Sequence, residues 1–228
     1  PSSAASDVYK RQAKTSRNGA ELRLYQRGNE FSIKADNQEL MNSQVHGSEE
    51  ILAKLACEKV TDHPDVRVLI GGLGLGYTVR AALDELKADA EVIVAEIVPD
   101  VLQWNRKFLG HLADHPLDDD RVTVELTDVA QIIQSDKGGF NAIMLDIDNG
   151  PQAMTREGNE WIYGLNGLES SFVALRPKGV FSIWSTDPDP AFTKRLLKIG
   201  FEVEEVKARA RGGNRGGGHY FVWVATRT

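Results

Sequence analysis

The stretch VRVLIGGLGLGYTVRAAL, residues 66–83, decides the fold, because an apolar run meets four glycines and then resumes with helix-forming residues. Residues 66–70 have the length and composition of a buried strand, and residues 77–87 continue as a helix. Glycine allows a backbone to turn sharply and to approach a ligand closely. The stretch therefore predicts a strand, a tight loop and a helix, with a ligand bound at the loop.

The spacing of the loop glycines limits what that ligand is. Gly72, Gly74 and Gly76 give G-x-G-x-G, which differs from the G-x-G-x-x-G fingerprint of dinucleotide binding. No Lys-Ser or Lys-Thr pair follows, so the loop is not a P-loop either. Backbone amides at the start of the helix still favour an anionic or polar group. An NAD-linked enzyme is therefore disfavoured.

The remainder of the chain alternates apolar runs with helical patterns. Strands are expected at 91–97, 121–126, 140–147 and 180–185, and two last strands at 201–208 and 219–227 follow each other directly. Helices are expected at 98–110, 129–135, 160–175 and 190–200. This order predicts an α/β fold with a doubly wound, seven-stranded, mostly parallel sheet and an antiparallel pair at one edge.

The N-terminal region differs in pattern from this core. Residues 21–33 predict a hairpin around Gly28 and Asn29, and residues 47–60 predict a helix with Ser48 as a candidate N-cap. Residues 1–19 contain no apolar run typical of a secretory signal and are interpreted as a disordered or non-native tail. The expected division is a tail at 1–19, a hairpin segment at 20–45 and a catalytic domain at 46–228.

Composition narrows the class of partner. The 228 residues are 41% hydrophobic, carry a formal net charge of −6 and include one cysteine, Cys57. The negative charge disfavours nucleic acid as a partner, and no apolar run approaches the ~20 residues of a membrane span. A single cysteine excludes an intrachain disulfide. We expect a cytoplasmic protein that acts on a small molecule.

Carboxylates follow three successive strands beside the glycine loop. Glu96 and Asp128 end the second and third strands of the core, and Asp146 ends the fourth, with Asp148 two residues later. Because the carboxyl ends of parallel strands share one edge of a sheet, these acids are expected to meet the loop there. Carboxylates accept hydrogen bonds from ribose hydroxyls and from an adenine amine. The pattern predicts a nucleoside site.

From about residue 31 to residue 185 the chain resembles the spermidine synthase family, a branch of the class I S-adenosylmethionine-dependent methyltransferase fold. The resemblance lies in LMNSQVHGSEEILAKLA, VLIGGLGLGYTVRAAL, VIVAEIVPDVLQWNRKFL, RVTVELTDVAQII, FNAIMLDIDNGP and NEWIYGLNGLESSFVALRPKGVFSIWS. It implies a transferase that binds S-adenosylmethionine or its decarboxylated form, and a homodimer. It also implies that Glu96 binds ribose, Asp128 with Val129 binds adenine, and Asp146 helps to deprotonate an attacking amine.

Four segments depart from the family pattern. Gly74 stands where the family places an aspartate in the loop, and DIDNGP replaces an Asp-x-x-Asp-Pro motif. STDPDP and RGGNRGGGHYF replace two further family segments near the acceptor. An aspartate in the loop would repel the α-carboxylate of intact S-adenosylmethionine, whereas Gly74 with its amides would accept it. This favours methyl transfer to an unidentified acceptor.

Two alternatives stay open. Asp148, Asp187 and Asp189 could rebuild an acidic amine site, which would make the protein a polyamine aminopropyltransferase; Asp148 and Asp187 are the acceptor-binding candidates. The chain could also bind a nucleoside without catalysis, because fold alone does not establish chemistry. His46 is expected either to contact substrate or to bond locally, and Trp184 either to border the pocket or to pack in the core.

Overall fold

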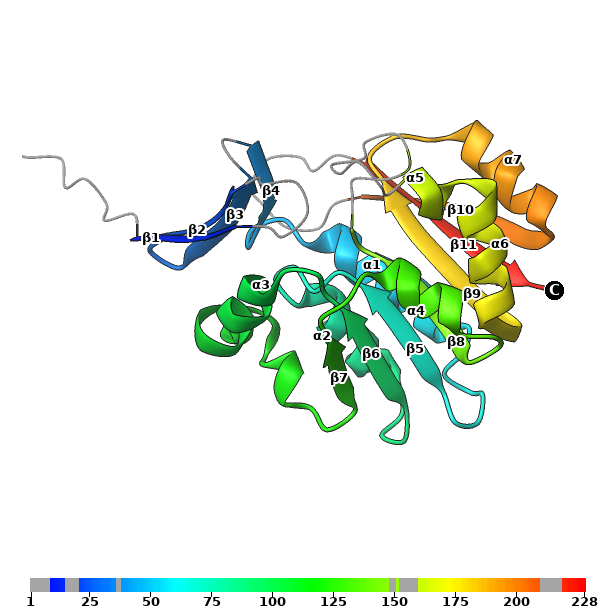
Figure 1. Ribbon diagram of the computed structural model, residues 1–228, viewed down its shortest axis with the longest axis horizontal. Helices are drawn as coiled ribbons and strands as arrows, with labels where there is room; N and C mark the ends of the chain where they lie inside the picture. Colours follow the sequence, from blue (N-terminus) through cyan, green and yellow to red (C-terminus); the bar gives the residue numbers. More distant parts are fainter. Residues whose placement is uncertain (1–8, 15–20, 36–37, 148–150, 152–159, 210–218) are drawn as a thin grey trace, which may run out of the picture.

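The structure is a computed structural model that describes residues 9–14, 21–35, 38–147, 151, 160–209 and 219–228. Its main body is a seven-stranded sheet with the order β10-β11-β9-β8-β5-β6-β7 (Figure 1). The strands are β5 (Arg67–Gly71), β6 (Glu91–Ala95), β7 (Val122–Glu125), β8 (Phe140–Leu145), β9 (Leu175–Ser185), β10 (Phe201–Arg209) and β11 (His219–Arg227).

Strand pairing confirms the predicted sheet. The strands from β9 to β7 pair in parallel, whereas β11 runs antiparallel to both β9 and β10. β5 pairs with β6 on one side and with β8 on the other. The strand order therefore reverses at β5, and ligands of doubly wound sheets bind at that switch point. The glycine loop leaves β5 at this place.

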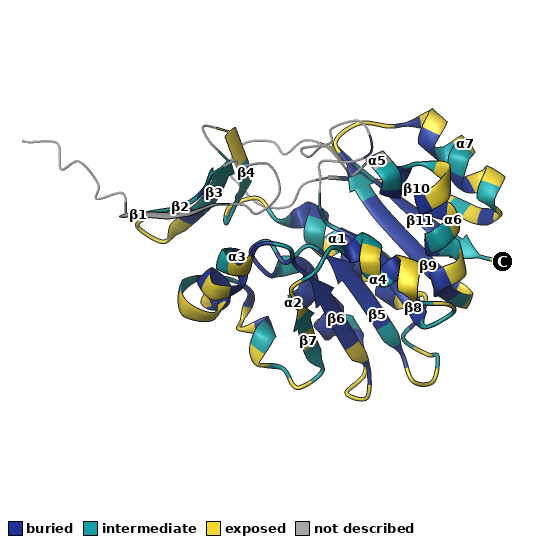
Figure 2. Ribbon diagram, in the orientation of Figure 1, coloured by how far each residue is buried: buried dark blue, intermediate teal, exposed yellow. Residues whose placement is uncertain are grey.

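Helices cover both faces of the sheet, which explains why its central strands are apolar on both sides (Figure 2). Along β5, Val68 and Ile70 pack on one face and Leu69 packs on the other. Helices α1 to α3 belong to the first core, and α4, α6 and α7 to the second. These helices are α1 (Gly47–Glu58), α2 (Tyr77–Glu85), α3 (Pro99–Trp104), α4 (Val129–Ser135), α6 (Leu165–Ala174) and α7 (Pro190–Ile199).

A second, four-stranded antiparallel sheet precedes the main body. It consists of β1 (Tyr9–Lys14), β2 (Glu21–Arg27), β3 (Glu30–Ala35) and β4 (Gln38–Asn42) in sequential order. The predicted hairpin at 21–33 is confirmed as β2 and β3. Within the predicted tail at 1–19, residues 9–14 are not disordered, because they form β1 and pair in register with β2; whether the tail is native stays open. Those residues lack apolar periodicity, so the strand depends on its neighbour.

The small sheet lies at the carboxyl ends of the parallel strands (Figure 1). Leu22, Leu24, Phe31 and Ile33 are buried and join the core that contains α1 and α2. The small sheet is therefore packed onto the main body. β4 brings its residues over the glycine loop, where they line the candidate site.

Three predicted helices differ in detail. The helix expected at 98–110 is α3 followed by a π-helix (Asn105–Leu109) and a 3-10 helix (Gly110–Ala113). The helix expected at 160–175 is split at Gly164 into α5 (Glu160–Tyr163) and α6. Ser48 is not the N-cap of α1; His46 holds that position. A further 3-10 turn spans Pro116–Asp118.

Two further observations concern the class of protein: the character of the helices and the burial of the cysteine. Within the described ranges, no helix has both the length and the apolar character needed to cross a membrane. Cys57 is fully buried on α1, and burial raises the pKa of its thiol to about 12. Cys57 is therefore a small side chain of the core.

Candidate functional site

The glycine loop joins three strands at the switch point. Gly72 donates its backbone N–H to the Ala95 carbonyl of β6 at 2.8 Å, and Asp146 donates its own N–H to the Gly71 carbonyl at 2.8 Å. Gly72 has φ of +91°, and a Cβ there would lie 2.3 Å from the Asp146 carbonyl oxygen. Glycine is required at this position both for its conformation and for the close approach of β8. The sequence prediction of a tight loop here is confirmed.

Glu96 fixes the same loop from β6. Its side chain is buried, and its two oxygens accept hydrogen bonds from the backbone N–H of Leu73 at 3.1 Å and of Val98 at 2.7 Å. A buried carboxylate that receives two backbone donors is strongly held. Glu96 therefore shapes the loop. Its predicted contact with ribose stays a prediction.

Asp128 and Val129 lie at the start of α4. Asp128 is the N-cap of that helix, and its Oδ1 accepts the Ala130 N–H at 3.0 Å. Val129 is buried beside Gly71. Their predicted adenine contacts stay predictions. We call Gly72, Gly74, Gly76, Glu96 and Asp128 the loop side of the site.

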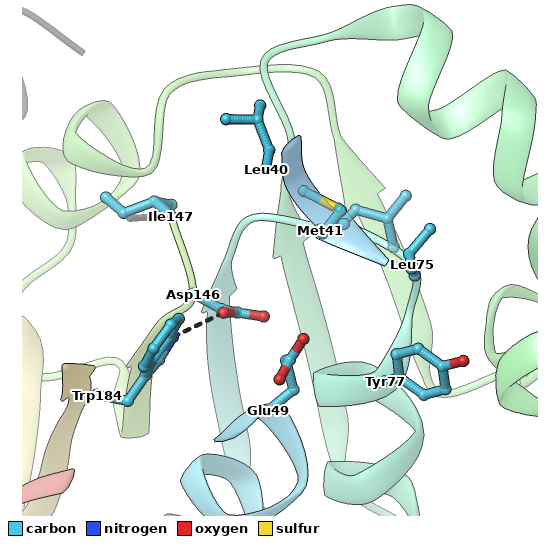
Figure 3. A pocket seen from close by; sticks show the side chains of 10 residues that line it. Leu40, Met41, Glu49, Leu75, Tyr77, Asp146, Ile147 and Trp184 are labelled. Atoms are coloured by element: carbon cyan, nitrogen blue, oxygen red, sulfur yellow. Dashed lines mark hydrogen bonds between the residues drawn. The ribbon is translucent and has the colours of Figure 1, made fainter. Parts of the chain in front are cut away.

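A pocket lies next to the loop side, and we call it the carboxylate pocket. Figure 3 shows the side chains of Glu49 and Asp146 directed toward one another within it, with Trp184, Tyr77 and Met41 around them. The pocket is partly open to solvent and has a volume of about 90 Å³. It is lined by Leu40, Met41, Glu49, Leu73, Gly74, Leu75, Tyr77, Asp146, Ile147 and Trp184. Among these described lining residues there are two carboxylates and no basic side chain.

Asp146 is held rigidly at the end of β8. Thr78 Oγ1 donates to its Oδ2 at 2.7 Å, and Trp184 Nε1 donates to its Oδ1 at 3.0 Å. Burial raises the pKa of the Asp146 carboxyl, and these two hydrogen bonds oppose the rise. The predicted pocket role of Trp184 is thus the one that the structure favours over simple core packing.

Glu49 is the residue that sequence reasoning missed. It lies in the first turn of α1, and Ser48 Oγ donates to its Oε2. Burial, and secondly the Asp146 charge, raise the pKa of Glu49 to about 7. In the sequence, Glu49 and Glu50 fit the ordinary preference for acids at a helix N-terminus. Nothing in that pattern distinguishes the pocket residue from its exposed neighbour.

Aromatic residues form the wall around the two carboxylates. Tyr77 donates its hydroxyl to the Ser43 carbonyl at 3.3 Å and stacks on His46 at 4.1 Å between ring centroids. His46 Nδ1 lies 2.7 Å from Glu50 Oε1, so the local-bond alternative holds for this histidine. Trp184 packs edge-on against Tyr220. Burial raises the pKa of both tyrosines, and the Glu49 charge adds to it.

The remaining acidic candidates lie elsewhere. Asp148 is outside the described residues. Asp187 is exposed, accepts the Thr186 hydroxyl at 3.0 Å and does not line the carboxylate pocket. Asp189 is the buried N-cap of α7 and accepts two backbone N–H groups there. Within the described part of the chain, no cluster of three or more His, Cys, Asp or Glu side chains could hold a metal ion.

Comparison with protein families assigns the chain. Residues 46–198 match the family described as the spermine/spermidine synthase domain. The chain belongs to this family. The resemblance inferred from the loop and strand-end acids is confirmed, and the chain is a transferase of the spermidine synthase-like type.

Solved structures show the same fold. A spermidine synthase from Thermotoga maritima gives a TM-score of 0.74 at 19% identity, covering 97% of this chain and 73% of that one. A spermidine synthase solved with the transition-state analogue AdoDATO gives 0.73 at 18%, covering 97% and 72%. A probable spermidine synthase from Corynebacterium glutamicum gives 0.68 at 14%, covering 96% and 81%. A search of curated proteins gives no significant match.

These comparisons bear on the reaction. They do not support methyl transfer, which the Gly74 argument favoured, and they fit the aminopropyl alternative better. The physical reason lies in the carboxylate pocket. Gly74 lacks a carboxylate, but Glu49 from α1 places one in the same cavity. The residue at position 74 alone therefore does not determine the charge of the site.

Proposed function

We propose that this spermidine synthase family member transfers an aminopropyl group from decarboxylated S-adenosylmethionine to an aliphatic amine. The observation that carries the proposal is the carboxylate pocket: Glu49 and Asp146 face one another, and the described lining offers no cation to neutralise them. A pair of half-buried acids that face one another is stabilised by a positive partner. Both the donor's propylammonium group and an acceptor ammonium supply one.

The same charges select against intact S-adenosylmethionine. Its α-carboxylate would enter a cavity that already holds Glu49 and Asp146. Two like charges about 4 Å apart repel by about 4 kcal/mol at an effective dielectric constant of 20. The decarboxylated donor has lost that group and retains only the ammonium. The charge balance of the pocket thus supports aminopropyl over methyl transfer.

The loop side and the carboxylate pocket divide the proposed task. The carboxylate pocket, of about 90 Å³, is far smaller than the ~300 Å³ of a small ligand pocket. A nucleoside is therefore expected along the strand ends at Glu96 and Asp128, with only the reacting chain entering the carboxylate pocket. A sulfonium is a ready leaving group, so the chain's main contribution is to align the reactants and manage the amine's proton.

Calorimetric titration in one buffer tests the donor. S-adenosylmethionine, its decarboxylated form and methylthioadenosine are compared, and the decarboxylated donor is expected to bind at least tenfold more tightly than the intact one. A preference for intact S-adenosylmethionine would contradict the proposal and restore methyl transfer. Absence of binding by all three would favour a module without catalysis.

An acceptor screen completes the test. Putrescine and spermidine are incubated with the decarboxylated donor, and the expected products are the amines extended by one aminopropyl group, detected by mass spectrometry. Donor binding without any extended amine would exclude these two acceptors. The predicted homodimer is tested separately by analytical ultracentrifugation, where a monomer at micromolar concentration would contradict it.

A further inference from the structure

Glu49 and Asp146 share one pocket but differ in how their oxygens are used. Both Asp146 oxygens accept side-chain donors, the Thr78 hydroxyl at Oδ2 and the Trp184 indole N–H at Oδ1. The side-chain hydrogen bond that the structure gives Glu49 is a hydroxyl, Ser48 Oγ, donating to Oε2. A carboxylate with both oxygens held by donors is a weak proton acceptor, because protonation would break one of those bonds. A carboxylate that receives a side-chain donor at one oxygen alone, as Glu49 does at Oε2, loses less on protonation.

The positions of the two acids in the fold also support different roles for them. Asp146 is fixed at the end of a central strand, between α2 and β9. Glu49 comes from the first turn of α1 and reaches into the cavity opposite it (Figure 3). A ligand nitrogen between them would touch a rigid anion on one side and a proton-accepting carboxylate on the other.

We infer that Glu49 is the proton acceptor for the amine and that Asp146 is the fixed anion beside it. This inference rests on the proposed function, because it assigns roles within the same reaction. It changes the role that family resemblance gives to Asp146, and it assigns a role to Glu49, for which that resemblance implied none.

The transfer step converts an ammonium and a sulfonium into a secondary ammonium, a neutral thioether and one released proton. An aliphatic amine enters as R-NH₃⁺, since its pKa is near that of lysine, about 10.4. Ionised Glu49 takes one proton and becomes neutral, leaving R-NH₂. The nitrogen lone pair attacks the carbon attached to sulfur; the new C–N bond forms as the C–S bond breaks, and its electron pair stays on the neutral thioether. The product is a secondary ammonium, and Glu49 returns its proton to water.

The surroundings of Glu49 determine its state before the amine binds. Asp146 from β8, Tyr77 from α2, Tyr220 from β11 and Glu50 on α1 itself are the titratable groups around it. None of these four carries a positive charge at neutral pH. Glu49 is consequently about half protonated at pH 7, given its pKa of about 7. Burial is the main cause of that raised pKa, and an arriving ammonium offsets both it and the Asp146 charge by pairing with the ionised form of Glu49.

The pH dependence of turnover tests the inference. Glu49→Gln is compared with Glu58→Gln, an exposed acid near the end of the same helix that pairs with Lys54. We expect kcat/KM for putrescine to fall by about 10²-fold in Glu49→Gln, with loss of the inflection near pH 7. Glu58→Gln should retain kcat/KM within about twofold and should keep the inflection near pH 7. A wild-type inflection that persists in Glu49→Gln would overturn the inference.

Proton release separates this inference from the proposed function. Calorimetric titration with putrescine at pH 7, in two buffers of different ionisation enthalpy, should show release of about half a proton by the wild type, and none by Glu49→Gln. If the wild type releases the proton but never extends an amine, the proposed function fails while Glu49 remains the group that faces the amine. If Glu49→Gln does not fold, Glu49→Asp is used, because its shorter side chain withdraws the carboxylate from the amine. Unchanged proton release and unchanged kcat/KM in Glu49→Asp would contradict the inference.

Discussion

The loop side and the carboxylate pocket are adjacent, yet they are built in different ways. The loop side comes from short segments that each follow a strand: Gly72 after β5, Glu96 after β6 and Asp128 after β7. The carboxylate pocket combines Met41 of β4, Glu49 of α1 and Trp184 of β9 with the end of β8. Local sequence encodes the first, whereas only tertiary packing assembles the second. The residues of the loop side can therefore be recognised in the sequence, whereas those of the carboxylate pocket can be recognised only in the fold.

The largest effect is expected from Gly72→Ala, which breaks the loop side. The new Cβ would lie 2.3 Å from the Asp146 carbonyl oxygen, and φ is +91°. The free energy of unfolding should fall by about 3 kcal/mol, from backbone strain and overpacking together. Urea unfolding monitored by circular dichroism measures it.

Gly74→Ala is the matched control for that change. Gly74 also has a positive φ, of +51°, but a Cβ there meets only the flexible Met41 side chain, at 3.3 Å. The loss should be about 1 kcal/mol. Equal losses in the two variants would mean that the contact between Gly72 and β8 is not what fixes the loop.

Asp146→Asn tests the residue where the two regions meet. The variant removes the fixed charge and places an amide where Thr78 and Trp184 both donate. We expect kcat/KM to fall by about 100-fold, measured as aminopropyl transfer from the decarboxylated donor. Affinity for methylthioadenosine should stay within threefold, because that nucleoside is expected to bind the loop side. Loss of methylthioadenosine binding would show that the two regions are not separable.

The sequence predicts the two regions unequally. The continuous apolar strand at 66–70 and the glycines that follow it predict both the switch point and the loop, since strand, turn and helix are adjacent along the chain. Glu49 could not be found in this way, because its first-turn position has an ordinary explanation as a helix-end acid. Strand β1 escaped prediction for a similar reason: residues 9–14 carry no apolar alternation, and only pairing with β2 makes them a strand.

Glu49→Gln should also change stability in a pH-dependent way. The folded pKa of Glu49, about 7, lies above the ordinary value of 4.5. The wild type therefore binds more protons when folded than when unfolded between pH 4.5 and 7. Its contribution to stability is present below pH 4.5 and is lost as the pH rises through 7. Gln does not titrate, so the variant should gain on the order of 2 kcal/mol over the wild type between pH 4 and pH 8.

Chemical unfolding at the two pH values measures that gain. Glu58→Gln provides the baseline, because Glu58 is exposed and pairs only on the surface of α1. A gain in Glu49→Gln that is the same at both pH values would mean that folding does not raise the pKa of Glu49. Glu49 would then not titrate near pH 7, in conflict with the inflection that the inference assigns to it.

Trp184→Phe should have a smaller effect, confined to the carboxylate pocket. It removes the Nε1 donor to Asp146 Oδ1, which opposes the rise in the Asp146 pKa. The pKa of Asp146 should rise further, so kcat/KM at pH 7 should fall by about fivefold, the equivalent of one hydrogen bond of about 1 kcal/mol. The inflection near pH 7, which the inference assigns to Glu49, should stay in place. A shift of that inflection to higher pH would mean that Asp146, and not Glu49, sets it.

Asp187→Asn should have the smallest effect, and it tests whether the carboxylate pocket is the whole acceptor site. Asp187 is a predicted acceptor-binding residue, but its side chain is exposed and accepts the neighbouring Thr186 hydroxyl. Exposed charges of this kind contribute little, because water screens them. The KM for putrescine should change by less than about twofold. A tenfold rise in KM would mean that part of the acceptor binds outside the pocket, at the loop after β9. The site would then consist of three regions instead of two.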